Sequence, residues 1–182
     1  MDRAAPAPVP APEPSAAAPT AAPRRVLIVC AGNLCRSPMA HALVRHHAAR
    51  RGAAGRIVVD SAGTHPFHPG GPAHPDTLAV LAHHGIDAAG LTCRGVVAED
   101  FEQFERIVAV DRPVLRRLAA WPQRRARLEL LLHYGASGLE DVPDPYLDGR
   151  FAELFALLDE ACAGLVDALL EPAPEPPATP SS

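Results

Sequence analysis

Lysine is absent from this 182-residue chain, so all 17 basic residues are arginines. Acidic residues outnumber basic ones by 21 to 17, which leaves a formal net charge of −4. Without an excess of positive charge there is no electrostatic argument for a nucleic-acid partner. The sequence also lacks an uninterrupted apolar run of about 18 or more residues. It therefore offers no candidate for a membrane span.

Cysteine is scarce, and its positions show no paired spacing: Cys30, Cys35, Cys93 and Cys162. A disulfide framework of the kind that stabilises small secreted proteins is therefore excluded. The N-terminal segment also lacks the apolar stretch of a signal peptide, because prolines interrupt it throughout. These two absences favour a cytoplasmic protein.

Proline is concentrated at the two ends of the chain, where residues 1–23 and 171–182 hold 12 of the 21 prolines. Both segments consist largely of alanine and proline, and cannot bury enough apolar surface to offset the cost of ordering the chain. We predict that both tails are disordered. The remaining residues, 24–170, have the usual length of a single compact domain.

Between the tails, short β-branched apolar runs alternate with segments of helical spacing. Strands are predicted over 26–30, 56–60, 106–110 and 127–131, and helices over 39–51, 76–84, 99–104, 113–120 and 151–170. Ser37 and Pro38 are predicted to open the first helix as its N-cap and first residue. The alternation indicates an α/β domain with a parallel sheet and helices on both faces. Ligands bind beyond the carboxyl ends of the strands in such sheets.

The loop after the first predicted strand reads Cys30-Ala-Gly-Asn-Leu-Cys-Arg36-Ser37. A loop that enters a helix N-terminus can point several backbone N–H groups at one centre, which binds an anion and favours a thiolate. Arg36 can grip two phosphate oxygens in a fork geometry that lysine cannot reproduce. Ser37 can donate a hydrogen bond to the sulfur, and Gly32 and Asn33 tolerate the positive φ of a tight loop. The motif predicts a phosphate site with Cys30 as nucleophile.

The segment VLIVCAGNLCRSPMA, residues 26–40, resembles the signature of the low-molecular-weight protein tyrosine phosphatases. VPDPYLDG, residues 142–149, resembles the acid loop of that family. Three intervening segments, DSAGT, AEDF and AVDRPVLRRL, are similar to family segments in the expected order. The resemblance covers roughly residues 24–170. It implies a single three-layer domain with a four-stranded parallel sheet and a phosphate-binding loop after the first strand.

This resemblance implies a protein-tyrosine phosphatase that works through a phosphocysteine intermediate on Cys30, with Arg36 as phosphate clamp and Asp144 as general acid. It implies no metal and no cofactor. The substrate-binding positions that it implies are Ala31, Gly32, Asn33, Leu34, Cys35, Ser37, Phe67 and Tyr146. The last two would be aromatic walls around a phenyl ring. The expected partner is a tyrosine-phosphorylated protein, a bacterial tyrosine kinase among the candidates, and the expected state is a monomer with no nucleic acid or membrane bound.

Four positions depart from the commonest residues of the family. Phe67 stands where a larger aromatic residue is usual, and Leu147 stands where a second aromatic residue often occurs. His41 replaces a common glutamate, and Leu91 replaces a usual histidine. Because the last two family residues belong to a polar network behind the phosphate loop, we expect this loop to be held differently.

Three other functions are weighed against this one. A protein-arginine phosphatase of the same family typically has threonine where this chain has Leu34. An arsenate reductase needs two further cysteines near the third strand, and residues 106–117 contain none. A non-catalytic phosphate-binding module would require neither Cys30 nor Asp144. The sequence therefore favours the tyrosine phosphatase.

Other reactive residues have structural interpretations. A zinc site at Cys30 and Cys35 would need a second pair of ligands, and the other two cysteines stand alone. The resemblance suggests a reversible disulfide between Cys30 and Cys35, while a packed thiol at Cys35 is the alternative. Adjacent histidines on a helix face different directions, which disfavours chelation by the histidine pairs. Asp111 is expected to cap the helix that follows it, and Asp144 can also cap a turn.

Overall fold

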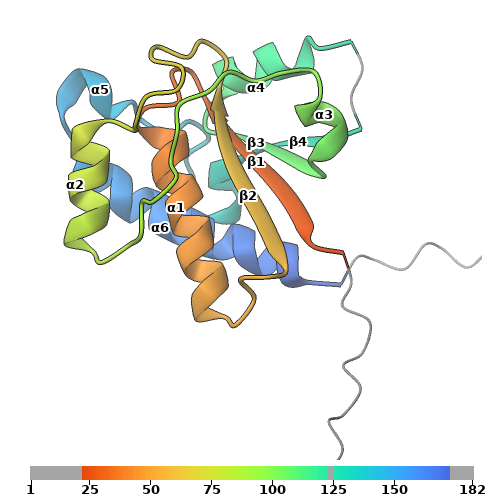
Figure 1. The fold of residues 1–182 in the computed structure, drawn as a ribbon, viewed down its shortest axis with the longest axis horizontal. Coiled ribbons are helices and arrows are strands. Elements are labelled where there is room, and N and C mark those ends of the chain that lie inside the picture. The colour runs from red at the N-terminus through yellow and green to blue at the C-terminus, as the bar shows by residue number, and fades with distance from the viewer. Residues whose placement is uncertain (1–21, 123–124, 173–182) are drawn as a thin grey trace, which may run out of the picture.

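The computed structural model in Figure 1 describes residues 22–122 and 125–172, so the predicted tails lie almost wholly outside the described residues. Four strands form one parallel sheet in the order β2-β1-β3-β4: β1 (Arg24–Cys30), β2 (Ile57–Gly63), β3 (Arg106–Ala109) and β4 (Arg127–Leu130). This confirms the predicted four-stranded parallel sheet. The chain passes outward from β1 to β2 and then returns to the other side of β1 at β3. The topological switch point therefore lies at β1, which ends at Cys30.

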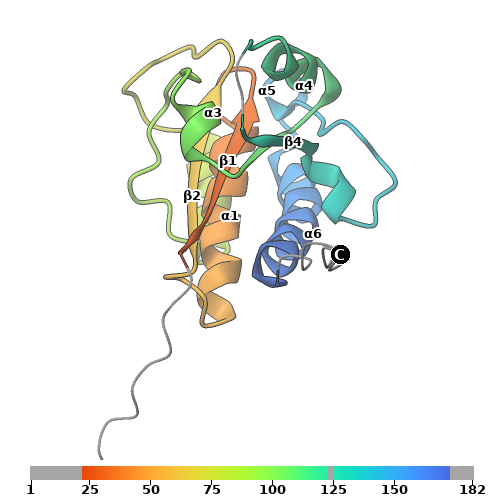
Figure 2. The same cartoon turned by 90° about the vertical axis from the view of Figure 1, so that its right-hand side faces the viewer.

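Helices cover both faces of the sheet, as the alternating pattern predicted (Figures 1 and 2). The elements are α1 (Arg36–Arg50), α2 (Pro75–His83), α3 (Asp100–Gln103), α4 (Arg112–Ala119), the 3₁₀ helix η1 (Leu131–Tyr134), α5 (Pro145–Asp148) and α6 (Phe151–Leu170). Val26 and Ile28 of β1 belong to the core formed with α1, α2 and α6, whereas Leu27 and Val29 belong to the core formed with α3 and α4. These four side chains are fully buried, which explains the continuous apolar run of this strand.

The first helix begins earlier than its sequence predicts. It starts at Arg36 with Cys35 as the N-cap residue, and Cys35 makes no capping hydrogen bond through its side chain. Ser37 is therefore not the N-cap, because its hydroxyl group bonds to the sulfur of Cys30 from within the first turn. The prediction of Ser37 as the N-cap was wrong. It rested on the frequency of Ser-Pro at helix starts, whereas the hydroxyl of this serine is bonded to the sulfur of Cys30.

Two further differences affect the site. Strand β2 continues to Gly63, three residues past the predicted end at 60, because its pairing with β1 extends to the Cys30–Gly63 register. The predicted loop over 141–149 contains the one-turn helix α5, which ends at Gly149 with a left-handed φ of 73°. None of the helices in the described ranges is long and apolar enough to cross a bilayer.

Candidate active site

The loop between β1 and α1 wraps around the sulfur of Cys30. Its Sγ accepts a hydrogen bond from the backbone N–H of Asn33 at 3.1 Å and another from the Ser37 hydroxyl at 3.0 Å. The loop turns back at Asn33, whose φ of 53° is the one positive value at a non-glycine residue in the described part of the chain. Donors aimed at the sulfur stabilise its thiolate form, which is the nucleophilic one.

The carbonyl groups of this loop point away from the sulfur. Four carbonyl oxygens accept backbone N–H groups of the 64–67 segment and of His74 at distances of 2.8 to 3.4 Å, namely those of Cys30, Ala31, Gly32 and Leu34. These carbonyls are engaged outside the loop, and the N–H of Asn33 faces inward, toward the sulfur. Inward-facing N–H groups followed by a helix N-terminus form a site for an anion.

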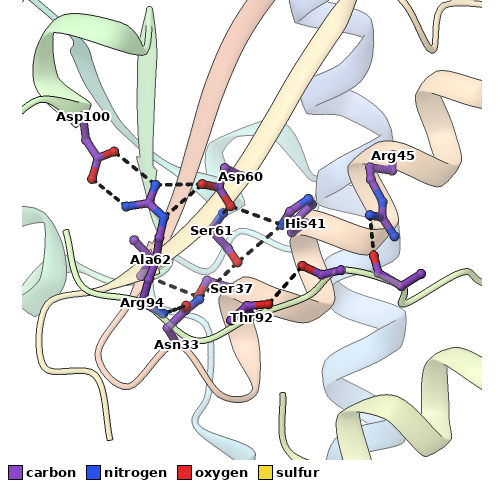
Figure 3. Close-up of polar contacts among 12 residues, drawn as sticks. Asn33, Ser37, His41, Arg45, Asp60, Ser61, Ala62, Thr92, Arg94 and Asp100 are labelled. Carbon is purple, nitrogen blue, oxygen red and sulfur yellow. Dashed lines mark hydrogen bonds and ion pairs between the residues drawn. The ribbon is translucent and has the colours of Figure 1, made fainter. Parts of the chain in front are cut away.

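The side chain of Asn33 holds the loop from behind (Figure 3). Its Nδ2 donates to the hydroxyls of Ser37 and Ser61 at 2.9 and 3.1 Å, and its Oδ1 accepts the backbone N–H of Arg94 at 2.8 Å. Asn33 is fully buried, so each of these bonds satisfies a polar atom that water cannot reach. The amide thus ties the phosphate loop to β2 and to the segment that contains Arg94.

Arg94 extends this network away from the loop, between two carboxylates (Figure 3). Its guanidinium donates to Asp60 Oδ2 at 2.8 and 2.9 Å and to Asp100 at 2.9 and 3.1 Å. Asp60 lies in β2 and Asp100 begins α3, so the arginine joins two elements. Pairing on both sides fixes the backbone N–H that Arg94 offers to Asn33.

His41 also contributes to the network, from α1. Its Nδ1 lies 3.4 Å from the Ser61 hydroxyl and 3.9 Å from Asp60, and the ring is buried. Burial, followed by the positive charge of Arg45, lowers the pKa of His41 to about 4, so the imidazole is neutral at pH 7. Leu91, the other departure from the family pattern, packs in the apolar core. The loop is therefore held through Asn33 and Ser61, with a neutral histidine behind them.

Arg36 reaches both the start of α4 and the acid loop. Its Nη1 donates to Asp111 Oδ2 at 2.7 Å and to the Val142 carbonyl at 3.2 Å, and its Nη2 donates to Asp144 Oδ2 at 2.8 Å. Asp111 caps α4 as predicted, because its Oδ1 accepts the N–H of Val114 at 2.7 Å. Its contact with Arg36 was missed. One signal pointed to it, since Asp111 follows directly after the third predicted strand, at the edge where functional side chains gather.

Asp144 combines a local role with its contact to Arg36. Its Oδ1 accepts the N–H of Tyr146 at 3.2 Å, which caps α5, while Oδ2 contacts the guanidinium. The carboxylate side chain is about two-fifths exposed. The aspartate is therefore held in place at the rim of the site while one oxygen remains able to exchange partners.

A pocket of about 290 Å³ opens above Cys30, and nine of its ten lining residues, all but Leu147, were predicted to bind substrate or catalyse the reaction. These residues are Cys30, Ala31, Gly32, Leu34, Cys35, Arg36, Phe67, Asp144, Tyr146 and Leu147. The rings of Phe67 and Tyr146 are nearly parallel, at 20°, with centroids 6.3 Å apart. Two other predicted positions, Asn33 and Ser37, lie buried behind the sulfur and do not line the pocket.

The remaining cysteines are buried free thiols. Burial, and secondarily the negative charges of Asp144 and Cys30, raise the pKa of the Cys35 thiol to about 12. Cys93 and Cys162 donate to backbone carbonyls at 3.4 and 3.7 Å, which suits structural roles. Over residues 22–122 and 125–172, no group of three or more His, Cys, Asp or Glu side chains is placed to hold a metal ion.

A cysteine thus stands at the carboxyl end of a parallel strand, with an arginine in the first turn of the next helix, at the edge of the sheet where ligands of α/β proteins bind. The family model described as low molecular weight phosphotyrosine protein phosphatase matches residues 25–173, so this chain belongs to that family.

Individual relatives agree with this assignment. A Bacillus subtilis protein named low molecular weight protein-tyrosine-phosphatase YfkJ is 40% identical over 144 residues, covering 78% of this chain and 92% of the relative. A Streptomyces coelicolor low molecular weight protein-tyrosine-phosphatase is 41% identical over 157 residues, covering 81% and 94%. The crystal structure of YfkJ matches with a TM-score of 0.78 at 38% identity, covering 82% of this chain and 96% of that one.

Proposed function

We propose that this protein hydrolyses phosphotyrosine in proteins through a phosphocysteine intermediate on Cys30. Membership of the family makes the chain a phosphoric monoester hydrolase, and the relatives described above are named protein-tyrosine-phosphatases. One observation carries the mechanism. The sulfur of Cys30 accepts two hydrogen bonds inside a loop whose carbonyls are bound on the outside, and Arg36 and Asp144 line the same pocket.

In the first step the Cys30 thiolate attacks phosphorus, and the bond from phosphorus to the phenolic oxygen breaks. The loop N–H groups and Arg36 bind the phosphate oxygens. Arg36 must first exchange its bond to Asp144 for one to the phosphate, while Asp111 keeps hold of the other nitrogen. Asp144, no longer paired with Arg36, takes up a proton from solvent and donates it to the leaving phenolate.

In the second step a water molecule attacks the phosphorus of the phosphocysteine, and the bond from sulfur to phosphorus breaks. Asp144, now ionised, accepts the proton of that water. The thiolate leaves into the hydrogen bonds of the Asn33 N–H and the Ser37 hydroxyl. These two donors favour both the attacking and the departing sulfur, since each is an anion.

The walls of the pocket favour an aryl phosphate. A phenyl ring stacked between two others needs roughly 3.5 Å of separation on each side, so Phe67 and Tyr146 must move apart slightly from 6.3 Å. Both rings are about 60% exposed and are free to do so. The arginine-phosphatase alternative is not favoured, because the relatives above are named for tyrosine and the apolar Leu34 lines the pocket.

The decisive test is hydrolysis of p-nitrophenyl phosphate and of a phosphotyrosyl peptide, with reductant and without added metal. Wild type is expected to turn over both substrates, and Cys30→Ser neither. Asp144→Asn is expected to slow substrates with poor leaving groups far more than activated ones. Turnover by Cys30→Ser would contradict the covalent mechanism. An inactive wild type would contradict the proposed phosphatase function.

The same proposal includes the cellular setting. We infer that the folded domain is the 24–170 segment and that it acts as a cytoplasmic monomer. Its substrate is a tyrosine-phosphorylated protein, for which a bacterial tyrosine kinase is one candidate. Loss of tyrosine phosphorylation from a co-expressed tyrosine kinase in the presence of wild type would support this assignment, provided that the kinase stays phosphorylated in the presence of Cys30→Ser.

A further inference from the structure

A second groove adjoins the phosphate pocket on the side of α2. It has a volume of about 580 Å³, and its lining residues are Leu34, His68, Pro72, Ala73, His74, Pro75, Leu78 and Tyr146. Leu34 and Tyr146 also line the phosphate pocket, so the two cavities share these walls. The reaction described above uses none of the other six residues.

This groove is held rigidly against the phosphate loop through His74. The backbone N–H of His74 donates to the Leu34 carbonyl at 2.9 Å, and its Nδ1 accepts the N–H of Asp76 at 3.2 Å. Its ring stacks on Phe151 with centroids 5.1 Å apart and meets the edge of Tyr146 at 5.8 Å. A surface that is already ordered loses little conformational freedom when a ligand binds.

The lining is apolar and carries no fixed charge. Five of its eight residues are aliphatic or proline, namely Leu34, Pro72, Ala73, Pro75 and Leu78, and none is an arginine, an aspartate or a glutamate. A charged side chain placed there would lose hydration without gaining a partner. A carboxylate at its edge, Asp76, lies 3.8 Å from His74 and would repel an acidic ligand. The chemistry therefore suits an aliphatic side chain.

We propose that this groove binds an aliphatic side chain of the substrate, within three residues of the phosphotyrosine. The proposal rests on the proposed function, because the phosphotyrosine places the peptide. A phenyl ring beside Tyr146 brings the peptide backbone to the mouth of the pocket, on the other side of the wall from the groove. One to three residues of extended chain span about 3 to 11 Å, which is sufficient to pass Tyr146. The groove then selects phosphotyrosine sites that have an aliphatic neighbour.

The test uses phosphotyrosyl peptides of serine and glycine in which one leucine is moved through the three positions on either side. For wild type we expect leucine at one or more positions to raise kcat/KM about fivefold over the serine peptide, mainly through a lower KM. Glutamate at the same position is expected to give no increase. If no position shows a leucine preference while the parent peptide is hydrolysed, the proposal is wrong.

Two variants assign the preference to the groove. His68→Glu adds a charge at an exposed lining residue, and Leu78→Ala shortens a wall, so each is expected to abolish the leucine effect. Both should retain kcat/KM on p-nitrophenyl phosphate, which does not reach the groove. His83→Glu, at the exposed far end of α2, is the matched control and should keep the preference. A preference that survives in both groove variants would overturn the proposal, whereas wild type inactive on p-nitrophenyl phosphate would instead refute the proposed function on which it rests.

Discussion

Arg36 and Asp111 form a buried ion pair in which Nη1 of the arginine donates to Oδ2 of the aspartate at 2.7 Å. The other oxygen of Asp111 accepts the N–H of Val114 and caps α4. One carboxylate therefore fixes both the start of a helix and the direction of the Arg36 guanidinium. The packing of α4 on the sheet consequently determines where the guanidinium stands relative to Cys30.

Replacing this carboxylate by an amide separates its two roles. Asparagine is as good an N-cap as aspartate, so Asp111→Asn should keep α4 while leaving Arg36 without its buried counter-charge. We expect kcat/KM on p-nitrophenyl phosphate to fall about tenfold and the free energy of unfolding to fall by about 2 kcal/mol. Steady-state kinetics and urea unfolding measure the two effects. Asp141→Asn, which changes an exposed ion pair with Arg112, is the control, and equal effects in both variants would contradict the prediction.

Gly32 supports the aromatic wall of the pocket. A Cβ at this position would lie 2.5 Å from Cδ2 of Phe67, and no other side chain is as near. Because Phe67 is 62% exposed, its ring can swing away at little cost to the fold. Gly32→Ala should therefore raise KM for aryl phosphates about threefold, the value of a weakened ring contact, with little change in unfolding midpoint.

A double-mutant cycle with Phe67→Ala tests this cause. If alanine at position 32 acts by displacing the ring, it should add almost nothing once the ring is gone. Additive effects of the two substitutions on KM would show that the added methyl group disturbs the phosphate loop itself.

The parts of the site that could be predicted from the sequence are those that are local in the chain. The run from Val26 to Cys30 and the spacing from Cys30 to Arg36 place the sulfur, the guanidinium and the strand within one short segment. The sequence pattern also predicts α6 with its observed bounds, since its apolar positions repeat with helical spacing.

Contacts between distant segments could not be predicted in this way. Asp111 lies 75 residues from Arg36, and the backbone N–H of Arg94 lies 61 residues from the Asn33 side chain that it supports. Such pairs depend on strand order and helix packing, which no local pattern contains. The same reason explains the error at Ser37, where a tertiary bond to sulfur takes the place of a local cap.

The left-handed turn at Asn33 can be separated from its side-chain bonds by two substitutions. Asn33→Gly loses the three hydrogen bonds but tolerates a φ of 53°, whereas Asn33→Ala loses the bonds and also strains the backbone. Both should be less active and less stable than wild type. We expect the alanine variant to be less stable than the glycine variant by about 1 kcal/mol in urea unfolding. If the glycine variant is instead the less stable one, the loss of stability comes from the side-chain hydrogen bonds and from chain entropy, and backbone strain contributes nothing.

His41 should make stability depend on pH in the mildly acidic range. Its pKa is about 4 in the folded protein, against an ordinary value of 6.5, because burial opposes the charged form. Between these values the unfolded chain binds a proton that the native protein does not, so stability rises with pH across this window. The contribution is complete above pH 6.5 and is lost as the pH falls toward 4. Since the ring is buried, it amounts to about 3 kcal/mol in total.

His41→Gln isolates this contribution, because glutamine stays neutral and can still donate a hydrogen bond to Ser61. Urea unfolding at pH 7 and at pH 4.5 should show that wild type loses about 2 kcal/mol more than the variant between the two conditions. His133→Gln, at an exposed histidine, controls for the loss of an imidazole as such. If wild type and His41→Gln lose stability in parallel while both remain folded at pH 7, the pKa of His41 is the same in the folded and the unfolded protein, and burial does not oppose its charge. If wild type instead loses less stability than the variant, the folded protein raises the pKa of His41, and the imidazolium would share Asp60 with Arg94.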